Sequence, residues 1–337
     1  TCERINVYSE TSVKNTSKSI ACVINVQVVA VQGRSVIKNT SHLKSRSYVR
    51  WTDDDVTFTT IENDVKRRDL TINALFYDIE TEEIVDLVGG IDDLKNGVVK
   101  TVGDPADRFS DDKLRKLRAI RFAGVTGSEL DKGIHDYLLK DPDLDQISSE
   151  RIRDEFLKGI AKSSSVVYFM NLLDKYNFFQ YIFPNLNINA SYVEEKDYII
   201  NLATLLREND SIEIRDILNK VTYSNEEIKN ILFLKSLLHL NQENVLDIKK
   251  SQYNTSVNDN QMLKFAKLNN IDEKLIRTFI QYIPSVSGKD VMDKMNIKGG
   301  PKVGEYIKQM EVDIFKELMS NESYQFKYIK EFVNYEK

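Results

Sequence analysis

The sequence predicts an α+β fold, in which a small α/β region comes first and helices make up the rest of the chain. Three observations support this prediction. Short runs of β-branched residues lie within the first hundred residues. A helix start follows them at Asp104-Pro105. Beyond it, residues 160–287 contain no glycine and carry apolar residues at helical spacing. We therefore expect four domains, which are residues 1–100, 101–165, 166–287 and 288–337.

Two pairs of strands are expected in the first hundred residues. Residues 20–25 and 27–31 are β-branched runs separated by a polar turn, which predicts a hairpin. Residues 71–77 and 83–88 have the composition of a second pair of strands. The first of these runs is equally compatible with a helical turn over residues 71–75, so both alternatives stay open there.

The first long helix is expected to start at residue 104. The Asp104 carboxylate can accept hydrogen bonds from the free amides of a first turn, and Pro105 suits the first helical position. At helical spacing, this helix would carry Leu114, Leu117 and Phe122 on its buried side.

Two further helix starts are expected in the all-α region. Ser224 and Asn270 are each followed three residues later by a glutamate, which is the spacing of a capping box. The Gly89-Gly90 pair predicts a loop instead, because its spacing matches neither of the glycine-rich phosphate-binding motifs.

Composition and charge exclude several classes of protein. With 41% hydrophobic residues, 29% charged residues and a net charge of −5, the chain has the composition of a globular protein. No apolar run reaches the roughly 18 residues of a membrane span, so we expect no membrane partner. Two cysteines, Cys2 and Cys22, and three histidines are too few for a disulfide framework or a zinc cluster. We expect a cytoplasmic protein without a disulfide partner.

The densest group of charges lies between residues 108 and 122. Asp112, Arg115, Arg118 and Arg121 follow one another at steps of three, which places them along one side of a helix. Such a stripe can be a solvated face with ordinary ion pairs. It can also read a nucleobase, because a carboxylate accepts from an exocyclic amino group while a guanidinium donates to the neighbouring acceptor. Cytosine and adenine present that edge, whereas uracil and guanine do not.

A second group of charges lies just after residue 66. Arg67 and Arg68 could hold a triphosphate through paired hydrogen bonds, while Asp69 and Asn73 could bind ribose hydroxyls. Adjacent arginines followed by an aspartate also occur by chance on many protein surfaces, so this group taken alone has the same two interpretations as the first.

Four segments that follow one another in the chain connect these groups, and they are Arg67–Ala74, Val85–Leu94, Val102–Phe122 and Ile147–Arg153. Together they closely resemble the class II tRNA nucleotidyltransferases (CCA-adding enzymes) and the bacterial poly(A) polymerases. The resemblance implies an incomplete nucleotidyltransferase-type α/β head, N-terminally truncated or divergent, followed by an all-α neck, body and tail. It also implies template-independent addition of CMP and AMP to the 3′ end of tRNA, from CTP and ATP.

The resemblance also implies roles for individual residues in the head. Arg68 and Asp69 match the motif that binds the ribose and triphosphate, and Asn73 stands at the position that belongs to the same motif.

In the neck, the resemblance assigns base selection to one pair. Asp112 and Arg115 match the amino-acid template for incoming CTP or ATP, and Arg118 and Arg121 match the nucleotide-contacting arginines that follow it. Asp111 stands where the family usually has glutamate, so its carboxylate keeps the charge and has a shorter reach.

The family holds two Mg²⁺ ions with an Asp-x-Asp pair and a third acid, and this set is not found in the sequence. The best alignment places Arg4 and Asn6 on the pair and Ala30 on the third acid. Mg²⁺ is a hard cation that needs carboxylate oxygens, so we identify no catalytic or metal-binding residue in this sequence. We therefore expect a turnover rate at least about 10³-fold below that of a family member with all three carboxylates. Asp53-Asp54-Asp55 is either a solvated loop or a substitute metal site. The alternative function is a degenerate member that binds tRNA and nucleotide without catalysis.

The C-terminal region is expected to bind RNA. The segments Gly288–Met292 and Ile297–Gly304 also resemble the CCA-adding branch of the family. The resemblance implies contact with the acceptor and TΨC arms of tRNA, and a basic stripe suits phosphate contacts. This stripe consists of Lys289, Lys294, Lys298, Lys302 and Lys308, of which the first four are assigned to RNA binding. Lysines at this spacing also occur on ordinary solvated surfaces.

Overall fold

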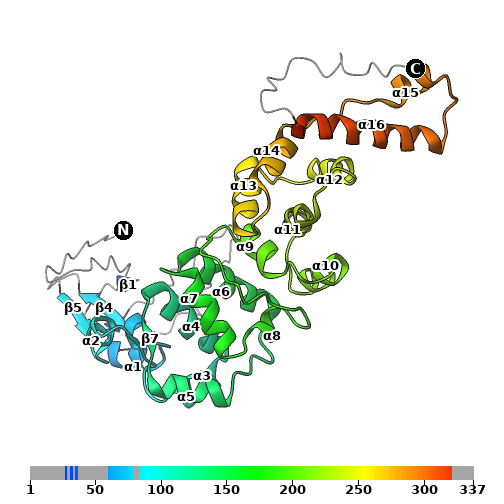
Figure 1. Ribbon diagram of the computed structural model, residues 1–337. Helices are drawn as coiled ribbons and strands as arrows, with labels where there is room; N and C mark the ends of the chain where they lie inside the picture. The colour runs from blue at the N-terminus through cyan, green and yellow to red at the C-terminus, as the bar shows by residue number, and fades with distance from the viewer. Residues whose placement is uncertain (1–26, 29–30, 33–34, 37–59, 79–82, 321–337) are drawn as a thin grey trace. The chain divides into compact units, whose positions relative to one another are not determined.

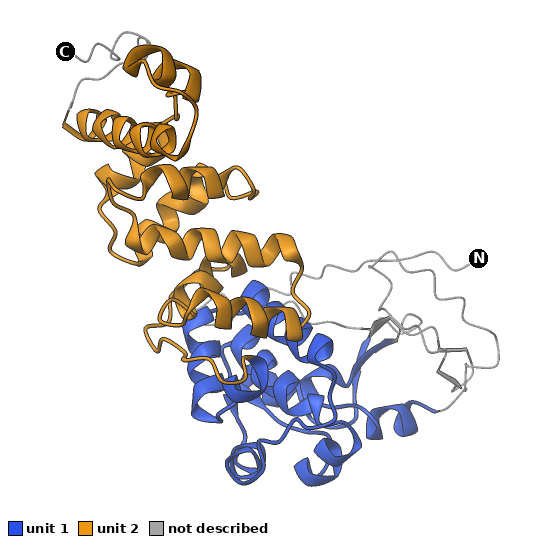
Figure 2. Cartoon of the chain, turned by 90° about the vertical axis from the view of Figure 1, so that its right-hand side faces the viewer, with its two compact units in different colours: residues 1–182 blue, residues 183–337 orange. Residues whose placement is uncertain are grey.

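The computed structural model describes residues 27–28, 31–32, 35–36, 60–78 and 83–320 (Figure 1). Two compact units divide the chain, residues 1–182 and residues 183–337 (Figure 2). The first unit contains the strands and the helices up to α8, and the second unit is helical throughout its described part. The predicted α+β fold is thereby confirmed. The finer domain borders expected at residues 165 and 287 stay predictions.

The first unit contains a small mixed sheet, which lies at one edge of the unit (Figure 1). Its strand order is β1-β4-β5, with β1 (Gln27–Val28) parallel to β4 (Leu75–Asp78) and β4 antiparallel to β5 (Glu83–Asp86). Leu75 pairs with Asp86 at one end of the antiparallel ladder. The helix α1 (Ile61–Lys66) packs its Val65 into a cluster with Phe76 of β4, which fixes the end of α1 beside the sheet.

The expected strand pairs are confirmed in part. Residues 71–77 begin as a 3₁₀ helix, η2 (Thr71–Asn73), and continue as β4, so each of the two alternatives holds for a part of this run. The hairpin of residues 20–25 and 27–31 stays a prediction, and the described residues of its second run belong to two sheets. Gln27–Val28 pairs with β4, whereas β2 (Val31–Gln32) pairs with β3 (Ser35–Val36) in a different sheet. Residues 20–25 lie outside the described residues.

The Gly89-Gly90 pair begins a helix, α2 (Gly90–Lys95), so the predicted loop is wrong there. The Asp86 carboxylate causes this turn, because it accepts hydrogen bonds from four successive backbone amides, those of residues 88–91. Gly89 has φ +77°, a conformation that favours glycine. A Cβ on Gly90 would lie 2.2 Å from the Thr71 carbonyl oxygen. The close approach holds α2 against η2, and therefore beside Asp69 and Asn73.

Gly90→Ala is expected to lower the free energy of unfolding by about 1–3 kcal/mol, because the added methyl group must displace backbone. Urea unfolding measures the change. Gly304→Ala is the matched control, because a Cβ there meets no atom within 4 Å and alanine favours a helix interior. Equal stability of the two variants would contradict the close contact.

The helix predicted from residue 104 is two helices. Asp104 caps α3 (Pro105–Asp111) through the Ala106 amide, with Pro105 at the first helical position, as predicted. The chain then leaves the helix at Asp112, which is extended with φ −155° and ψ 107°, and α4 runs over Leu114–Thr126. The expectation of one helical stripe that includes Asp112 is therefore wrong. The Asp112 carboxylate accepts from the Leu114 amide and caps the new helix instead.

The buried side of α4 is mostly as predicted. Leu114 and Leu117 are buried, but Phe122 is only half-buried. Its ring lies 4.1 Å from the Arg121 guanidinium carbon and 5.7 Å from that of Arg118. Phe122 thus packs against the charged side chains of its own helix, and this contact keeps it near the surface.

The remaining helices of the first unit surround α4. A Cβ on Gly159 of α6 would lie 2.1 Å from the Phe169 ring of α7, so a glycine is needed for these helices to approach. α6 also packs along α4, which brings the residues after Ser149 opposite the charged side of α4. The elements after α4 are β7 (Glu129–Leu130), parallel to β6 (Val98–Val99), then α5 (Lys132–Lys140), α6 (Ser149–Lys162), α7 (Val166–Lys175) and α8 (Phe179–Ile182).

The described part of the second unit is entirely helical, as predicted. Ser224 and Glu227 form the expected capping box at α11. The start expected at Asn270 is wrong, because Asp272 caps α14 and Asn270 has φ +55° in the turn after α13. No helix in the described ranges is long and apolar enough to cross a membrane. The helices are α9 (Tyr198–Leu205), α10 (Ser211–Lys220), α11 (Asn225–Ser236), η3 (Leu237–His239), α12 (Val245–Gln252), α13 (Asp259–Leu268), α14 (Glu273–Gln281), α15 (Gly288–Met295) and α16 (Pro301–Ser320).

Candidate functional site

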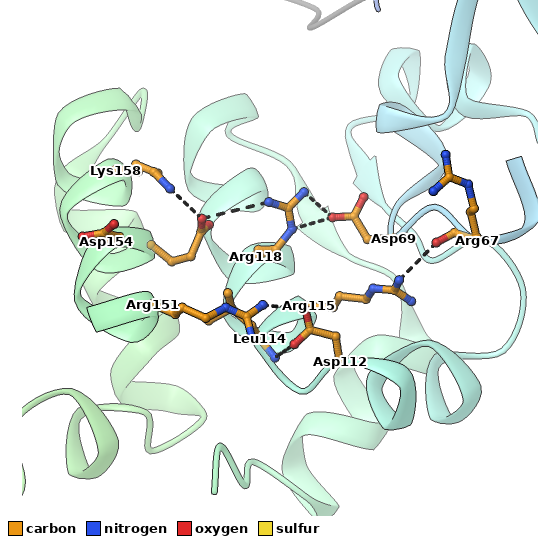
Figure 3. Close-up of a pocket in the computed structure, with 10 residues that line it drawn as sticks. Arg67, Asp69, Asp112, Leu114, Arg115, Arg118, Arg151, Asp154 and Lys158 are labelled. Carbon is orange, nitrogen blue, oxygen red and sulfur yellow. Dashed lines mark hydrogen bonds and ion pairs between the residues drawn. The ribbon is translucent and has the colours of Figure 1, made fainter. Parts of the chain in front are cut away.

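A cavity of about 530 Å³ lies in the first unit, and most of its lining is charged (Figure 3). Its walls come from the turn after α1, from the α3–α4 break with α4, and from α6. Five basic and four acidic side chains give the lining a net charge of +1. The lining residues are Arg67, Asp69, Asp112, Leu114, Arg115, Arg118, Arg151, Asp154, Glu155 and Lys158. The structure therefore brings together five of the residues singled out in the sequence: Arg67, Asp69, Asp112, Arg115 and Arg118.

An ion pair between Asp69 and Arg118 joins the turn after α1 to α4. The Arg118 Nε and Nη2 atoms lie 2.7 and 2.6 Å from one Asp69 oxygen. The other oxygen accepts from the Leu70 amide and from the Asn73 side chain. Burial opposes ionisation of Asp69, but Arg118 and these hydrogen bonds hold the pKa of the Asp69 carboxyl below its usual value. The Asp69 side chain is therefore ionised and is held in one position by its hydrogen-bond partners.

Glu155 on α6 continues this network and was not found from the sequence. It is buried, its carboxylate accepts from Arg121 Nε at 2.6 Å and from Lys158 at 3.1 Å, and Arg118 lies 4.0 Å away. Figure 3 shows Arg118 pointing toward Asp69. Burial opposes ionisation, but the surrounding cations lower the pKa of Glu155. The sequence signal that was available is the helical spacing of Arg151, Glu155 and Lys158, which starts within the Ile147–Arg153 segment.

The side chains of Asp112 and Arg115 line the same cavity and bind different partners, while the Arg115 amide donates to the Asp112 carbonyl at 3.0 Å. One Asp112 oxygen caps α4, and the other accepts from Arg151 at 2.8 Å. Arg115 donates to the carbonyls of Arg108 and Arg67 and lies 3.3 Å from Asp111. These contacts come from separate elements, so the surface interpretation of ion pairs along one helix does not describe the group.

The other predicted site residues lie behind the lining or outside it. Arg68 turns away from the cavity to Asp64 and donates to the Asn73 carbonyl, and its guanidinium carbon lies 4.4 Å from the Phe76 ring centre. Arg121 is 7% exposed and bonds to Glu155. Asp111 is half-exposed beside Arg115. Contact of these residues and of Asn73 with a nucleotide stays a prediction.

The predicted RNA-binding lysines lie in the second unit. Lys289 and Lys294 are on α15, Lys298 follows it, and Lys302 is on α16. All four are exposed. α15 and α16 pack together through a cluster that includes Val291, so the lysines stand on a folded platform.

Comparison with known proteins finds similarity to CCA-adding enzymes along most of the chain. The family model for the poly A polymerase head domain matches residues 5–100. The CCA-adding enzyme of Ligilactobacillus salivarius is 29% identical over 275 residues, which cover 76% of this chain and 68% of that protein. That of Lactococcus lactis (strain IL1403) is 27% identical over 326 residues, 88% of this chain and 79% of the relative. Over most of its length the chain is similar to CCA-adding enzymes, and its first hundred residues match the poly A polymerase head domain.

The fold agrees with this similarity. The crystal structure of the Bacillus stearothermophilus CCA-adding enzyme in complex with CTP superposes with a TM-score of 0.59 at 22% identity, over 80% of this chain and 76% of that one. A second family model, described as the probable RNA and SrmB-binding site of polymerase A, matches residues 138–189. Arg67 and Asp69 thus lie in the region matched by the head model, and the α6 residues of the cavity lie in the region matched by the second model.

The depressed pKa values of Asp69 and Glu155 predict a loss of stability in acid. A carboxylate whose pKa is lower in the folded than in the unfolded chain stabilises the fold above the unfolded value, about 3.9 for Asp and 4.3 for Glu, and ceases to do so as the pH falls through the folded value. The free energy of unfolding in urea should therefore fall between about pH 5 and pH 3. The fall should be smaller in Asp69→Asn and Glu155→Gln, and an unchanged pH profile in both variants would contradict the assignment.

Proposed function

We propose that this chain is a tRNA nucleotidyltransferase, which adds CMP and AMP to the 3′ end of tRNA without a nucleic-acid template. One observation carries the proposal: Asp112 and Arg115 stand in one mainly charged cavity of a chain that is similar to CCA-adding enzymes over most of its length. This similarity supports the reaction class, and the side chains of the cavity support the choice of nucleotide.

The chemistry of Asp112 and Arg115 suits the Watson-Crick edges of cytosine and adenine. Each Asp112 oxygen accepts one protein hydrogen bond, and a carboxylate oxygen has a second lone pair for an exocyclic amino group. Arg115 has five N–H donors, of which its described contacts with Arg108, Asp111 and Arg67 use three. The remaining donors can bind the neighbouring acceptor of the base. Uracil and guanine would place a donor opposite Arg115 or an acceptor opposite Asp112.

The other cations of the cavity suit a triphosphate. Arg67, Arg151 and Lys158 stand on two facing walls, and arginine binds phosphate oxygens in pairs. Each of these three cations also pairs with a carboxylate, but their side chains are 45–51% exposed. The Arg118 side chain is 27% exposed and pairs with the nearly buried Asp69, so its part is to hold the α1 turn and α4 at a fixed separation. The protein thereby orients a nucleotide between the head and α6.

Nucleotidyl transfer by CCA-adding enzymes calls for Mg²⁺, which would neutralise the triphosphate and activate the RNA hydroxyl. Among the described residues, no group of three His, Cys, Asp or Glu side chains could hold such an ion. Asp53 and Asp55, the substitute pair, lie outside the described residues. The described side chains therefore do not fit the ion by themselves, and we assign them only binding and orientation.

The tRNA is expected to bind the four tail lysines through its phosphates. A variant with Lys→Ala at residues 289, 294, 298 and 302 should bind tRNA more weakly. Its plot of log affinity against log salt concentration should be less steep by up to about 3 units of slope, because fewer counterions are released. Filter binding from low to high salt measures this. A control with four exposed lysines of the first unit replaced (Lys95, Lys100, Lys132 and Lys140) should keep most of the slope. An unchanged slope in the tail variant would place the RNA elsewhere.

Incubation with a tRNA that lacks its 3′ CCA tests the proposed reaction. With Mg²⁺, labelled CTP and ATP, and protein in excess over tRNA, we expect extension by CMP and then AMP. EDTA, or a tRNA that already ends in CCA, should abolish it. Selective binding of CTP and ATP without any extension would refute catalysis and favour a protein that binds tRNA and nucleotide only.

A further inference from the structure

The geometry of the α3–α4 break depends on residues that lie outside the cavity. Asp112 faces the cavity from this break, between the last residue of α3 and the first of α4. Its backbone is extended there, and the Arg115 amide donates to the Asp112 carbonyl at 3.0 Å, so the conformation of the break sets where Asp112 lies relative to Arg115. The segment that follows α5, residues 141–145, contacts the same break through residues that do not line the cavity.

Two lysines connect the break to this segment. Lys113, the residue after Asp112, forms an ion pair with the Asp143 carboxylate. Lys116, one turn into α4, has a side chain that is only 1% exposed, and its Nζ lies 3.1 Å from an Asp141 oxygen and 2.9 Å from the Asp143 carbonyl. A buried ammonium needs such partners, since an unpaired buried charge is costly. The lysines on both sides of Leu114 and Arg115 are therefore tied to one short segment.

Tyr137 of α5 ties the same segment to both helices. Its hydroxyl donates to Asp141 at 3.0 Å, and its ring centre lies 5.2 Å from that of Phe109 on α3. The Lys116 Nζ lies 5.4 Å from the same ring centre. The carboxylates of Asp141 and Asp143 accept the amides of residues 143 and 145, so the segment is also fixed internally.

We propose that Asp141 and Asp143 are positioning residues for nucleotide selection: through Lys113 and Lys116 they fix the α3–α4 break, and so the place of the Asp112 carboxylate opposite the base. This inference rests on the proposed function. Discrimination by a carboxylate and a guanidinium requires both to meet one base edge, and small displacements are enough to lose it. We expect the segment to act on selection through the break, because none of residues 141–145 lines the cavity.

Charge reversal across the half-buried Lys113–Asp143 pair tests the proposal. Lys113→Glu and Asp143→Lys should each lower the CTP-over-UTP affinity ratio by about 10-fold, with UTP affinity nearly unchanged. The double variant K113E/D143K should restore most of the ratio, because it rebuilds the ion pair. Titration calorimetry with CTP, ATP, UTP and GTP measures the ratio, and thermal unfolding shows whether each variant is folded.

A matched control is Asp92→Lys, which breaks the exposed Lys95–Asp92 pair of the same unit and should leave the ratio unchanged. If the single variants keep the wild-type ratio, or weaken all four nucleotides by one common factor, the inference is wrong and the proposed function stands. If the wild type itself does not prefer CTP and ATP, the proposed base selection and this inference both fail.

Discussion

Arg115→Ala is expected to weaken binding of CTP and ATP by about 5- to 150-fold, because the acceptor on the base is left unpaired in a partly dehydrated cavity. The affinity for UTP and GTP should fall much less, since the Watson-Crick edges of their bases do not match Arg115 in the wild type. Asp112→Ala should have the same selective effect through the lost acceptor for the exocyclic amino group. Titration calorimetry without tRNA measures both, so the result does not depend on turnover.

Arg277→Ala is the control for the loss of an arginine. Its guanidinium binds Glu273 on the surface of α14, in the second unit. We expect the same nucleotide affinities as in the wild type. Equal affinity of the wild-type chain for all four nucleotides would contradict base reading, and so would a preference for CTP and ATP that survives both cavity substitutions.

Arg118→Ala is expected to lower the free energy of unfolding by about 3 kcal/mol and to weaken all four nucleotides alike. The reason is that Asp69 is nearly buried and would lose the cation that balances its charge. The cavity walls on the α1 turn and on α4 would then separate, whichever base is bound. Urea unfolding and the four-nucleotide titration measure the two effects.

Asp69→Asn separates the effect of the charge from the effect of the side-chain size in the Asp69–Arg118 pair. The amide keeps the size of the side chain but removes the carboxylate, so the double variant D69N/R118A should be less destabilised than the sum of the single variants. Arg277→Ala serves again as the exposed control, with an expected change below about 0.5 kcal/mol. Additive effects at Asp69 and Arg118, or selective loss of CTP and ATP in Arg118→Ala, would show that this pair has another role.

The helix starts show which parts of the fold were predictable. The caps at Asp104 and Ser224 depend on hydrogen bonds between residues two or three positions apart, so the local sequence contains the whole cause. The start at Asn270 failed because Asp272 offers a competing cap two residues later. The break at Asp112 depends on tertiary partners such as Arg151, and local spacing contains no trace of them.

The cavity also contains residues that the local sequence predicts and residues that only tertiary packing places there. Asp69, Asp112, Arg115 and Arg118 were predicted from spacing and resemblance, and they do line one cavity. Glu155 was missed, because it is opposite Arg118 only through the packing of α6 on α4. Arg121 shares the spacing of the other arginines, but the rotation of α4 turns it inward, so a regular sequence pattern did not distinguish a cavity residue from a buried one.

The 3′ end sequence of a tRNA extended in the presence of all four nucleotides tests protein-directed selection most directly. The tRNA starts without its CCA, Mg²⁺ is present, and the products are read by sequencing. We predict that the wild-type chain adds C, C and A in that order, and that Arg115→Ala adds nucleotides with reduced preference for C and A. Products of mixed sequence from the wild type, or an unaltered CCA end from both Asp112→Ala and Arg115→Ala, would contradict selection by this cavity.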